Sequence, residues 1–252
     1  MIPAERLRKI LTLLKNQEVI SISELVNLLD VSHMTVRRDI EKLEGQGKVN
    51  SVSGGVQLTQ SIHSELSHDL KASQFFEQKV QIGELAANLI PINATLYLDA
   101  GTTSLEIAHQ IINRDDLLII TNDFVIAIFL MTNSGNEIYH TGGKIDRHNQ
   151  SAVGPKVANF LLGMNIDIAF ISTSSWSLKG LSTPNEDKVV VKQAIAKMSN
   201  AVYLISDSSK YGIIATFHAL DIEEIDAVIT DTELAESAKV ELVNKGIDVI
   251  TP

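Results

Sequence analysis

Two short helix patterns joined by a tight turn constrain the fold of this chain more than any other feature. The first helix is predicted to open at Ser21, because a serine followed three residues later by a glutamate is the capping-box pattern. The second is predicted to run from Ser32 to Gly47, so that only Asp30 and Val31 remain for the turn. Helices joined this closely form a helix-turn-helix, whose second helix enters the major groove of DNA while the first crosses the backbone.

The second helix has one apolar face and one polar, cationic face. Val36, Ile40 and Leu43 fall at i, i+4 and i+7, which places them together on the buried side. A serine cap adds the positive end of the helix dipole to the outward arginines, and such an end suits phosphates and base edges. An Arg-Arg pair alone is more typical of an ordinary solvated helix, but the preceding helix favours DNA binding. The residues predicted to contact DNA are Ser32, His33, Thr35, Arg37, Arg38, Lys42 and Lys48.

The flanking segments complete a small domain. A longer helix is predicted from about Pro3 to Lys15, and Pro3 suits its first turn because no amide proton is needed there. After the second helix, residues 49–58 alternate around Gly54 and Gly55 in the manner of a hairpin. Three helices followed by a hairpin predict a winged helix.

Residues 1–58, called the head below, resemble the N-terminal domain of the DeoR family of bacterial sugar-responsive transcriptional regulators. The resemblance is carried by the leucine-rich first helix, the run Val31-Ser32-x-x-Thr35-Val36-Arg37-Arg38-Asp39-Ile40, Leu43-Glu44-x-x-Gly47 and the terminal Gly54-Gly55. It implies binding to double-stranded operator DNA. The wing departs from the family pattern, since Asn50 and Ser51 stand where relatives usually carry arginine. Lys48 is its only basic side chain.

The sequence contains no cysteine, which excludes disulfides, thiolate zinc sites and cysteine nucleophiles and suits a reducing compartment. No apolar run approaches the roughly 18 residues typical of a membrane span, and no signal-peptide pattern opens the chain. A cytoplasmic protein with no membrane partner is expected.

Charge is divided unevenly along the 252 residues. The net charge is −10, but the head holds eight Lys and Arg against seven Asp and Glu, a balance of +1, which leaves −11 for the remainder. A nearly neutral head attracts DNA weakly over long range, so local Arg and Lys contacts must supply the phosphate neutralisation. Two or more heads on neighbouring half-sites would compensate by avidity. We therefore expect a homo-oligomer, a dimer or tetramer, on a repeated or palindromic operator.

Residues 59–74 are rich in serine, histidine and charge and lack a sustained apolar stripe, which predicts a linker that is helical in part. His63 and His68 lie in this linker without acidic or cysteine partners at metal-ligand spacing. Solvated histidines are therefore expected there, and no metal site.

From Phe75 onward, helix-length patterns alternate with short apolar runs, which predicts a larger Rossmann-like, mostly parallel α/β domain. The predicted strands are 96–98, 117–120, 137–140, 168–171, 201–206, 227–229 and 248–250. The predicted helices are 77–89, 104–112, 124–131, 156–162, 188–198 and 234–245. Ligands of such sheets bind at the carboxyl ends of the strands, so polar residues that follow each strand are the binding candidates.

Five of these strand ends carry similar polar chemistry. The segments are Asp99–Ser104, Thr121–Asp123, Thr141–Lys144 with Arg147, Ser172–Ser175 and Asp207–Lys210. In the first, Gly101 permits close backbone approach and the next helix offers its amides to an anion, in the manner of a phosphate cradle. Each segment alone is more typical of a cap or a turn. Their convergence at corresponding strand ends favours a binding site.

Residues 75–252, called the body below, resemble the DeoR C-terminal sensor domain, which is similar in fold to ribose-5-phosphate isomerase and other sugar-phosphate isomerases. The resemblance rests on Asp99–Thr103, Thr121-Asn122, Gly142-Gly143 with Arg147, Ser182-Thr183-Pro184 with Glu186 and Lys192, and Asp207–Gly212. It implies binding of a phosphorylated sugar or related sugar acid, with the anion on Gly101, Thr102, Thr103 and Lys210, and no cofactor. The candidate effector-binding residues are Asp99, Gly101, Thr102, Thr103, Thr121, Asn122, Gly142, Gly143, Lys144, Arg147, Ser172, Glu186, Lys192, Asp207 and Lys210.

Two functions from different classes remain open. The first is a transcriptional regulator, a repressor of a carbohydrate or sugar-acid catabolic operon that leaves its operator when the effector favours another head arrangement. An activator would have the same sequence features. The second is a sugar-phosphate isomerase carrying a DNA-binding head. Isomerases of this fold place an acidic Asp-Gly-Ala-Asp-Glu run near the fourth strand end, whereas Ser172–Ser175 offers no general base. This difference favours the repressor with no catalytic residue, and Asp99, Glu186 or Asp207 remain alternative bases.

Overall fold

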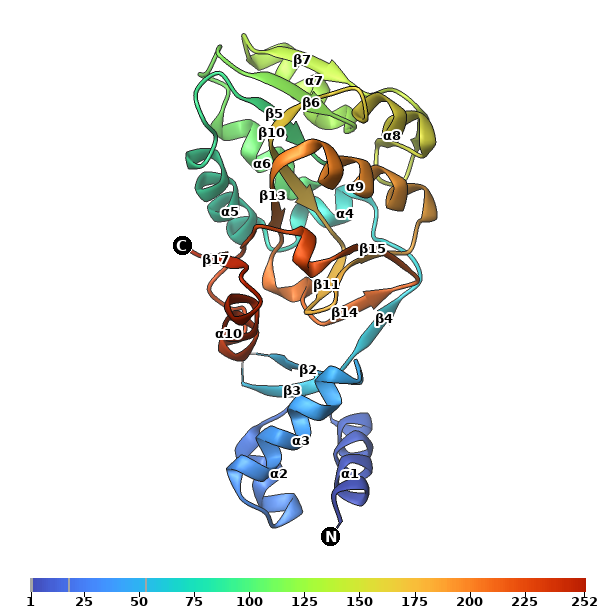
Figure 1. Ribbon diagram of the computed structural model, residues 1–252, viewed down its shortest axis with the longest axis vertical. Coiled ribbons are helices and arrows are strands. Elements are labelled where there is room, and N and C mark those ends of the chain that lie inside the picture. Colours follow the sequence, from blue (N-terminus) through green and yellow to red (C-terminus); the bar gives the residue numbers. More distant parts are fainter. Residues whose placement is uncertain (1, 18, 53) are drawn as a thin grey trace.

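The computed structural model describes residues 2–17, 19–52 and 54–252, and it shows a small head joined to a larger α/β body (Figure 1). The elements of the head are α1 (Pro3–Asn16), β1 (Val19–Ile20), α2 (Ile22–Leu29), α3 (His33–Gly45), β2 (Val49–Val52) and β3 (Gly55–Leu58). β2 and β3 form the expected antiparallel hairpin, and β1 pairs with β3 as a third strand. The winged helix-turn-helix fold is confirmed.

Two serine caps start the helices of the helix-turn-helix. Ser21 Oγ accepts a hydrogen bond from the amide of Glu24 at 3.1 Å, and Ser32 Oγ accepts one from the amide of Thr35 at 3.2 Å. Asp30 ends α2 in a left-handed conformation with φ 54°, which reverses the chain toward α3. The apolar faces of the three helices then form one core with the hairpin, made of Ile10, Leu14, Ile20, Leu25, Leu29, Val36, Ile40, Leu43, Val49 and Val56.

A seven-stranded parallel sheet forms the centre of the body, in the order β17-β16-β13-β10-β5-β6-β7. Its strands are β5 (Thr95–Leu98), β6 (Leu118–Thr121), β7 (Glu137–His140), β10 (Ile166–Ser172), β13 (Ser199–Ile205), β16 (Ala227–Ile229) and β17 (Asp248–Ile250). One face is covered by α5 (Phe76–Asn88), α6 (Thr102–Gln110) and α7 (Phe124–Asn133), and the other by α8 (Pro155–Leu161), α9 (Glu186–Met198) and α10 (Glu236–Asn244). The predicted strands and helices of the body are present, and the mostly parallel α/β fold is confirmed.

Alternate residues of the central strand β10 face the two helical layers. Ile168 and Phe170 pack with α5, α6 and α7, whereas Ala169 and Ile171 pack with α8, α9 and α10. A strand buried on both faces therefore needs a continuous apolar run, which is what the sequence shows there. These runs are short, and within the described ranges no helix combines the length and apolar composition needed to cross a membrane.

Several short strands of the body were not expected from the sequence. They are β8 (Lys144–Asp146) with β9 (Ser151–Val153), β11 (Ser175–Ser177) with β12 (Gly180–Thr183) and β15 (Phe217–Asp221), and β14 (Ile213–Ala215). All but β15 are only three or four residues long, which is too short for a usable period-two apolar pattern. The body also contains two short 3-10 helices, η1 (Ser208–Lys210) and η2 (Ile222–Glu224).

The segment 59–74, expected to be a linker, packs on the body. Its first part, β4 (Gln60–Ile62), pairs in parallel with β14, and its second part, α4 (His68–Ser73), contacts α6. Ser67 caps α4 by accepting a hydrogen bond from the amide of Leu70 at 3.4 Å. The segment therefore links the head to two separate parts of the body.

Candidate functional site

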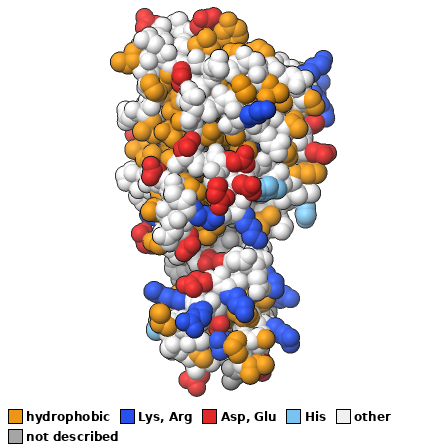
Figure 2. All heavy atoms as spheres, viewed as in Figure 1, with side chains coloured by type: hydrophobic (Ala, Val, Ile, Leu, Met, Phe, Trp, Pro, Cys, Tyr) orange, Lys and Arg blue, Asp and Glu red, His pale blue; other side chains and the backbone are white. Residues whose placement is uncertain are grey.

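The cationic face of α3 lies on the outside of the head. Arg37, Arg38 and Lys42 are exposed, as are Ser32 and His33. Within residues 2–17, 19–52 and 54–252, none of the three cations has a carboxylate within ion-pair distance. Figure 2 shows Lys and Arg side chains gathered on the head. These cations are available to DNA phosphates and base edges.

Two further residues of α3 complete this face. Thr35 is half-buried, and its hydroxyl lies 2.9 Å from that of Ser32. Met34 was not expected on the face, yet it is 72% exposed beside the helix start. An exposed apolar side chain at that position suits contact with a thymine methyl group.

A buried ion pair holds α3 on α1. The guanidinium of Arg6 contacts both carboxylate oxygens of Asp39, with Nη2 at 3.0 Å from Oδ1. Asp39 belongs to the buried side of α3, opposite the exposed arginines. The pair therefore fixes the orientation of α3 within the head.

The wing contacts the body through Asn50. Lys48 is exposed, but Asn50 is buried, and its amide nitrogen donates to Gly212 O at 2.6 Å and to Thr59 Oγ1 at 2.9 Å. A side chain on Gly212 would collide with Asn50, since a Cβ there would lie 2.6 Å from the Asn50 Cγ. The residue that replaces the usual wing arginine is thus used for contact between head and body.

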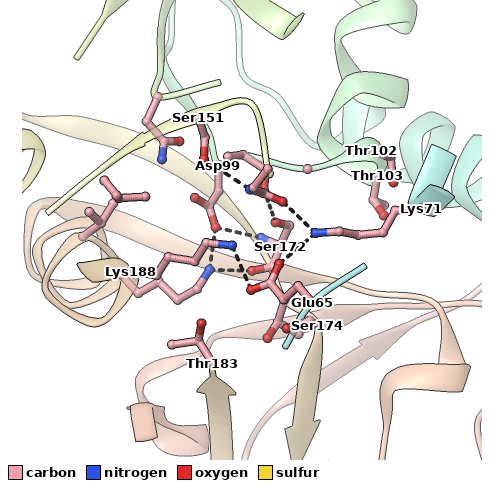
Figure 3. Close-up of a pocket in the computed structure, with 18 of the residues that line it drawn as sticks. Glu65, Lys71, Asp99, Thr102, Thr103, Ser151, Ser172, Ser174, Thr183 and Lys188 are labelled. Atoms are coloured by element: carbon pink, nitrogen blue, oxygen red, sulfur yellow. Dashed lines mark hydrogen bonds and ion pairs between the residues drawn. The ribbon is translucent and has the colours of Figure 1, made fainter. Parts of the chain in front are cut away.

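A polar pocket in the body gathers eight of the candidate effector residues (Figure 3). It lies at the carboxyl ends of β5, β6 and β10, where the polar residues that follow these strands predicted a binding site. The candidates that line it are Asp99, Gly101, Thr102, Thr103, Asn122, Ser172, Lys192 and Lys210. Residues that line it without having been candidates include Glu65, Lys71, Asn149, Ser151, Ser174, Thr183 and Lys188.

The start of α6 contributes hydrogen-bond donors to one part of the pocket. A Cβ on Gly101 would lie 2.8 Å from Ser172 Oγ, so glycine is needed for the close approach of the two strand ends. The hydroxyls of Thr102 and Thr103 make no hydrogen bond among the described residues, and the first-turn amides of α6 have no partner within the helix. Free amides and hydroxyls at a helix N-terminus suit an anion.

Lysines give the pocket a positive balance in an acidic body. Four lysines and two carboxylates line it, a surplus of two positive charges. Lys192 is buried, with Nζ 2.6 Å from Asp99 Oδ2 and 2.6 Å from Ser172 O. Lys210 Nζ lies 2.8 Å from Oδ2 of the buried Asp207. Each of these two lysines is held in place by a carboxylate that neighbours it.

The other two lysines share one carboxylate, that of Glu65. Glu65 Oε2 lies 2.7 Å from Lys71 Nζ, and Oε1 lies 2.8 Å from Lys188 Nζ. Burial opposes ionisation of Glu65, but the charges of Lys188 and Lys71 outweigh it and lower the pKa of Glu65 from 4.5 to about 2. Burial lowers the pKa of Lys71, and Glu65 opposes that effect. Glu65 therefore remains a carboxylate at neutral pH.

Seven candidate effector residues lie outside the pocket wall. Thr121 is buried and donates its hydroxyl to Leu98 O at 2.7 Å, and Asp207 reaches the pocket only through Lys210. Lys144 is exposed and pairs with Asp187 at 2.6 Å. The remaining four, Gly142, Gly143, Arg147 and Glu186, lie on loops or at the start of α9 and do not line the pocket.

The lining residues that were not predicted differ in how visible they were in the sequence. Lys188 precedes the candidate Lys192 by four residues on α9, so both lysines fall on one face of that helix, and this spacing could have identified it. Glu65 and Lys71 lie in the segment 59–74, which has no apolar stripe to indicate which side faces the body. Across the described residues, no group of three or more His, Asp or Glu is placed to hold a metal ion.

The pocket and the wing meet at the segment 208–212. Lys210 lines the pocket, and two residues later Gly212 accepts the hydrogen bond from Asn50. The amide of Gly212 donates to Trp176 O at 2.8 Å, which ties this turn to β11. Next to this contact, a cleft of about 320 Å³ between head and body is lined by residues from both, among them Ser51, Gln57 and Tyr211.

Comparisons with known proteins agree with these two parts. Residues 6–62 match the DeoR-like helix-turn-helix domain, and residues 74–232 match the DeoR C terminal sensor domain. An uncharacterized HTH-type transcriptional regulator of Haemophilus influenzae is 54% identical over 249 residues, which cover 99% of this chain and 97% of that protein. The glycerol-3-phosphate regulon repressor of Escherichia coli is 33% identical over 228 residues, which cover 90% of each.

Among solved structures, a ribose 5-phosphate isomerase A from Methanocaldococcus jannaschii aligns with 54% of this chain and 54% of its own, with 15% identity and a TM-score of 0.41. A likeness at this level supports no conclusion about activity. The two domain matches together span nearly all of the sequence, and the relatives align over their full architecture. The chain belongs to the DeoR family of DNA-binding transcriptional regulators.

Proposed function

We propose that the protein represses a carbohydrate or sugar-acid catabolic operon and leaves its operator when a phosphorylated sugar or sugar acid enters the body. The observation that carries this proposal is the pocket at the strand ends, where a helix N-terminus and four lysines face one small space. An anion is the ligand that such a site favours. The name of the Escherichia coli relative, a glycerol-3-phosphate regulon repressor, supports a phosphorylated effector.

The contact between Gly212 and Asn50 supports coupling between effector and DNA. An effector that pairs with Lys210 would shift the charge balance of the turn that also holds the wing. Such a shift changes the head arrangement only if the effector binds one arrangement more tightly than the other. The favoured arrangement would then present the two α3 helices of an oligomer at the wrong half-site spacing.

We further propose that the functional unit is a cytoplasmic homo-oligomer, a dimer or tetramer. The head is nearly neutral overall, with eight Lys and Arg against seven Asp and Glu. A single head of this kind would bind DNA weakly, and two linked heads gain affinity through effective concentration.

An isomerase-like activity is the second candidate, and the pocket disfavours it. Its two carboxylates, Glu65 and Asp99, are both in ion pairs with lysine. A general base for sugar isomerisation works best with a pKa near the working pH, and the pKa of Glu65 is about 2. Turnover of ribose 5-phosphate at an enzyme-like rate, followed by NMR, would reverse this preference.

The direct test is fluorescence anisotropy of a labelled duplex from the region upstream of the gene. The duplex is titrated with the full chain and then challenged with sugar phosphates and matching unphosphorylated sugar acids. We expect specific binding that a phosphorylated compound releases. Release only by an unphosphorylated acid would assign the pocket to a carboxylate. The proposal is contradicted if the full chain binds neither this duplex nor duplexes from neighbouring promoters specifically, even at low salt.

A further inference from the structure

The carboxylate of Glu65 occupies the part of the pocket that two lysines face. Figure 3 shows it between Lys71, which comes from α4, and Lys188, which comes from α9. Lys71 Nζ also donates to Asn149 Oδ1 at 2.6 Å. Glu65, Lys71 and Lys188 are only 10–16% exposed at their side chains. The three groups form a closed arrangement in which one internal anion satisfies two part-buried cations.

The pocket is too small for a sugar phosphate while Glu65 is in place. Its free volume is about 40 Å³, enough for only a few water molecules. Pockets for small organic ligands usually measure about 300 Å³ or more. A ligand of that size can enter only if one of the lining side chains moves out. Glu65 is the lining carboxylate that belongs to the segment between head and body, and its removal would open the pocket and leave Lys71 and Lys188 without a carboxylate partner.

We propose that Lys71 and Lys188 form an anion subsite, that Glu65 occupies it as an internal competitor, and that the phosphate of the effector binds there by displacing Glu65. This inference rests on the proposed function and adds to it the place of the phosphate and the residue that must leave. The subsite lies in the same pocket as Thr102 and Thr103, so a phosphate on the two lysines can also reach the start of α6.

The competition favours a phosphate over a carboxylate. A phosphate monoester carries about −1.5 to −2 charges at neutral pH and three acceptor oxygens. Glu65 carries one charge and two oxygens, but its tether gives it a high effective concentration. A free monocarboxylate offers the lysines no more than Glu65 already does, so it should compete poorly. A phosphate offers the two lysines more charge and one additional acceptor oxygen.

Displacement of Glu65 would also loosen the chain that leads to the head. The carbonyl of Glu65 lies 2.9 Å from His148 Nε2, and the amide of His68 donates to His148 O at 3.1 Å. These contacts and the lysine pairs hold residues 63–68 on the body. Glu65 lies three residues after the end of β4, so its release frees the segment between β4 and α4.

The test uses inorganic phosphate and the full chain. Phosphate affinity is measured by isothermal titration calorimetry for the unaltered chain and for Glu65→Gln, which keeps the size of the side chain and removes its charge. We expect Glu65→Gln to bind phosphate at least about tenfold more tightly, because the competitor no longer reduces the fraction of open subsite. Glu84→Gln, on the exposed side of α5, is the matched control and should equal the unaltered chain.

Two further measurements keep the result specific. Lys188→Met should weaken phosphate binding at least about tenfold. This loss distinguishes phosphate bound at the subsite from phosphate bound by the cations of α3. Hydrogen exchange should show faster exchange of amides 63–68 when phosphate is added to the unaltered chain, and fast exchange without phosphate in Glu65→Gln. Acetate should bind the unaltered chain far more weakly than phosphate.

The outcomes separate this inference from the proposed function. If phosphate binds in a Lys188-dependent manner but Glu65→Gln gains no affinity and amides 63–68 become more protected, the inference is wrong and the anion pocket stands. If neither the unaltered chain nor Glu65→Gln binds phosphate in a Lys188-dependent manner, both the inference and the phosphorylated effector are contradicted.

Discussion

The cations of the head and those of the body pocket are arranged in opposite ways. On α3, Arg37, Arg38 and Lys42 are exposed and have no carboxylate partner among the described residues. In the pocket, all four lysines are paired with carboxylates of the chain itself. Exposed cations can meet DNA phosphate at any time, at a strength that depends on salt. Paired lysines accept an outside anion only if it outcompetes an internal one, and this condition is what a sensor requires.

The largest expected effect comes from breaking the buried ion pair between Arg6 and Asp39 in the head. Asp39→Asn leaves Arg6 buried without its carboxylate, and we expect the head to lose about 3 kcal/mol of unfolding free energy. Urea denaturation, monitored through the hydrogen exchange of head amides, measures this loss. Asp30→Asn, at the exposed left-handed turn, makes the same chemical change and should alter stability little. Equal stability of the two variants would contradict the role of the pair.

The exposed cations should matter for DNA and not for the pocket. Arg37→Ala and Arg38→Ala are each expected to weaken operator binding by about 1 to 3 kcal/mol, because each removes a contact to a base edge or phosphate. Anisotropy with the operator duplex measures the change, and phosphate binding by the body should stay the same. Arg8→Ala, exposed on α1, is the control. Unchanged operator affinity in both α3 variants would remove this face from the interface.

The paired lysine at the turn 208–212 should show the reverse pattern. Lys210→Met is expected to leave operator affinity within about 0.5 kcal/mol and to raise the effector concentration needed for release about tenfold. Its side chain lines the pocket, and its loss also leaves Asp207 buried without an ion-pair partner, so some loss of body stability is expected. Lys156→Met, exposed on α8, is the control. A fully responsive Lys210→Met would place the effector elsewhere.

A pH dependence of stability is expected from Glu65. The folded-state pKa of about 2 lies below the ordinary value of 4.5, so ionised Glu65 stabilises the fold fully above pH 4.5. This contribution is lost as the pH falls from 4.5 toward 2. Unfolding free energy measured across that window should therefore decline more steeply for the unaltered chain than for Glu65→Gln. Parallel curves would show that Glu65 makes no charge-dependent contribution.

Much of the fold followed from local patterns. The caps at Ser21 and Ser32 and the apolar faces of α1, α2 and α3 are set by residues within one or two helical turns of each other, so the sequence predicts them directly. The short strands β11, β12 and β14 were missed, because their pairing depends on partners far along the chain.

The candidate site divides in the same way. The sequence by itself determined the strand ends with Asp99, Gly101 and Ser172, because parallel strands bring their carboxyl ends to one edge of the sheet whatever the details of packing. Only the tertiary structure decided which distant side chains join them. Glu65 meets Lys188 across 123 positions, and Asn50 meets Gly212 across 162. No local period encodes such contacts, since they depend on how residues 59–74 and the wing pack on a body that must already be folded.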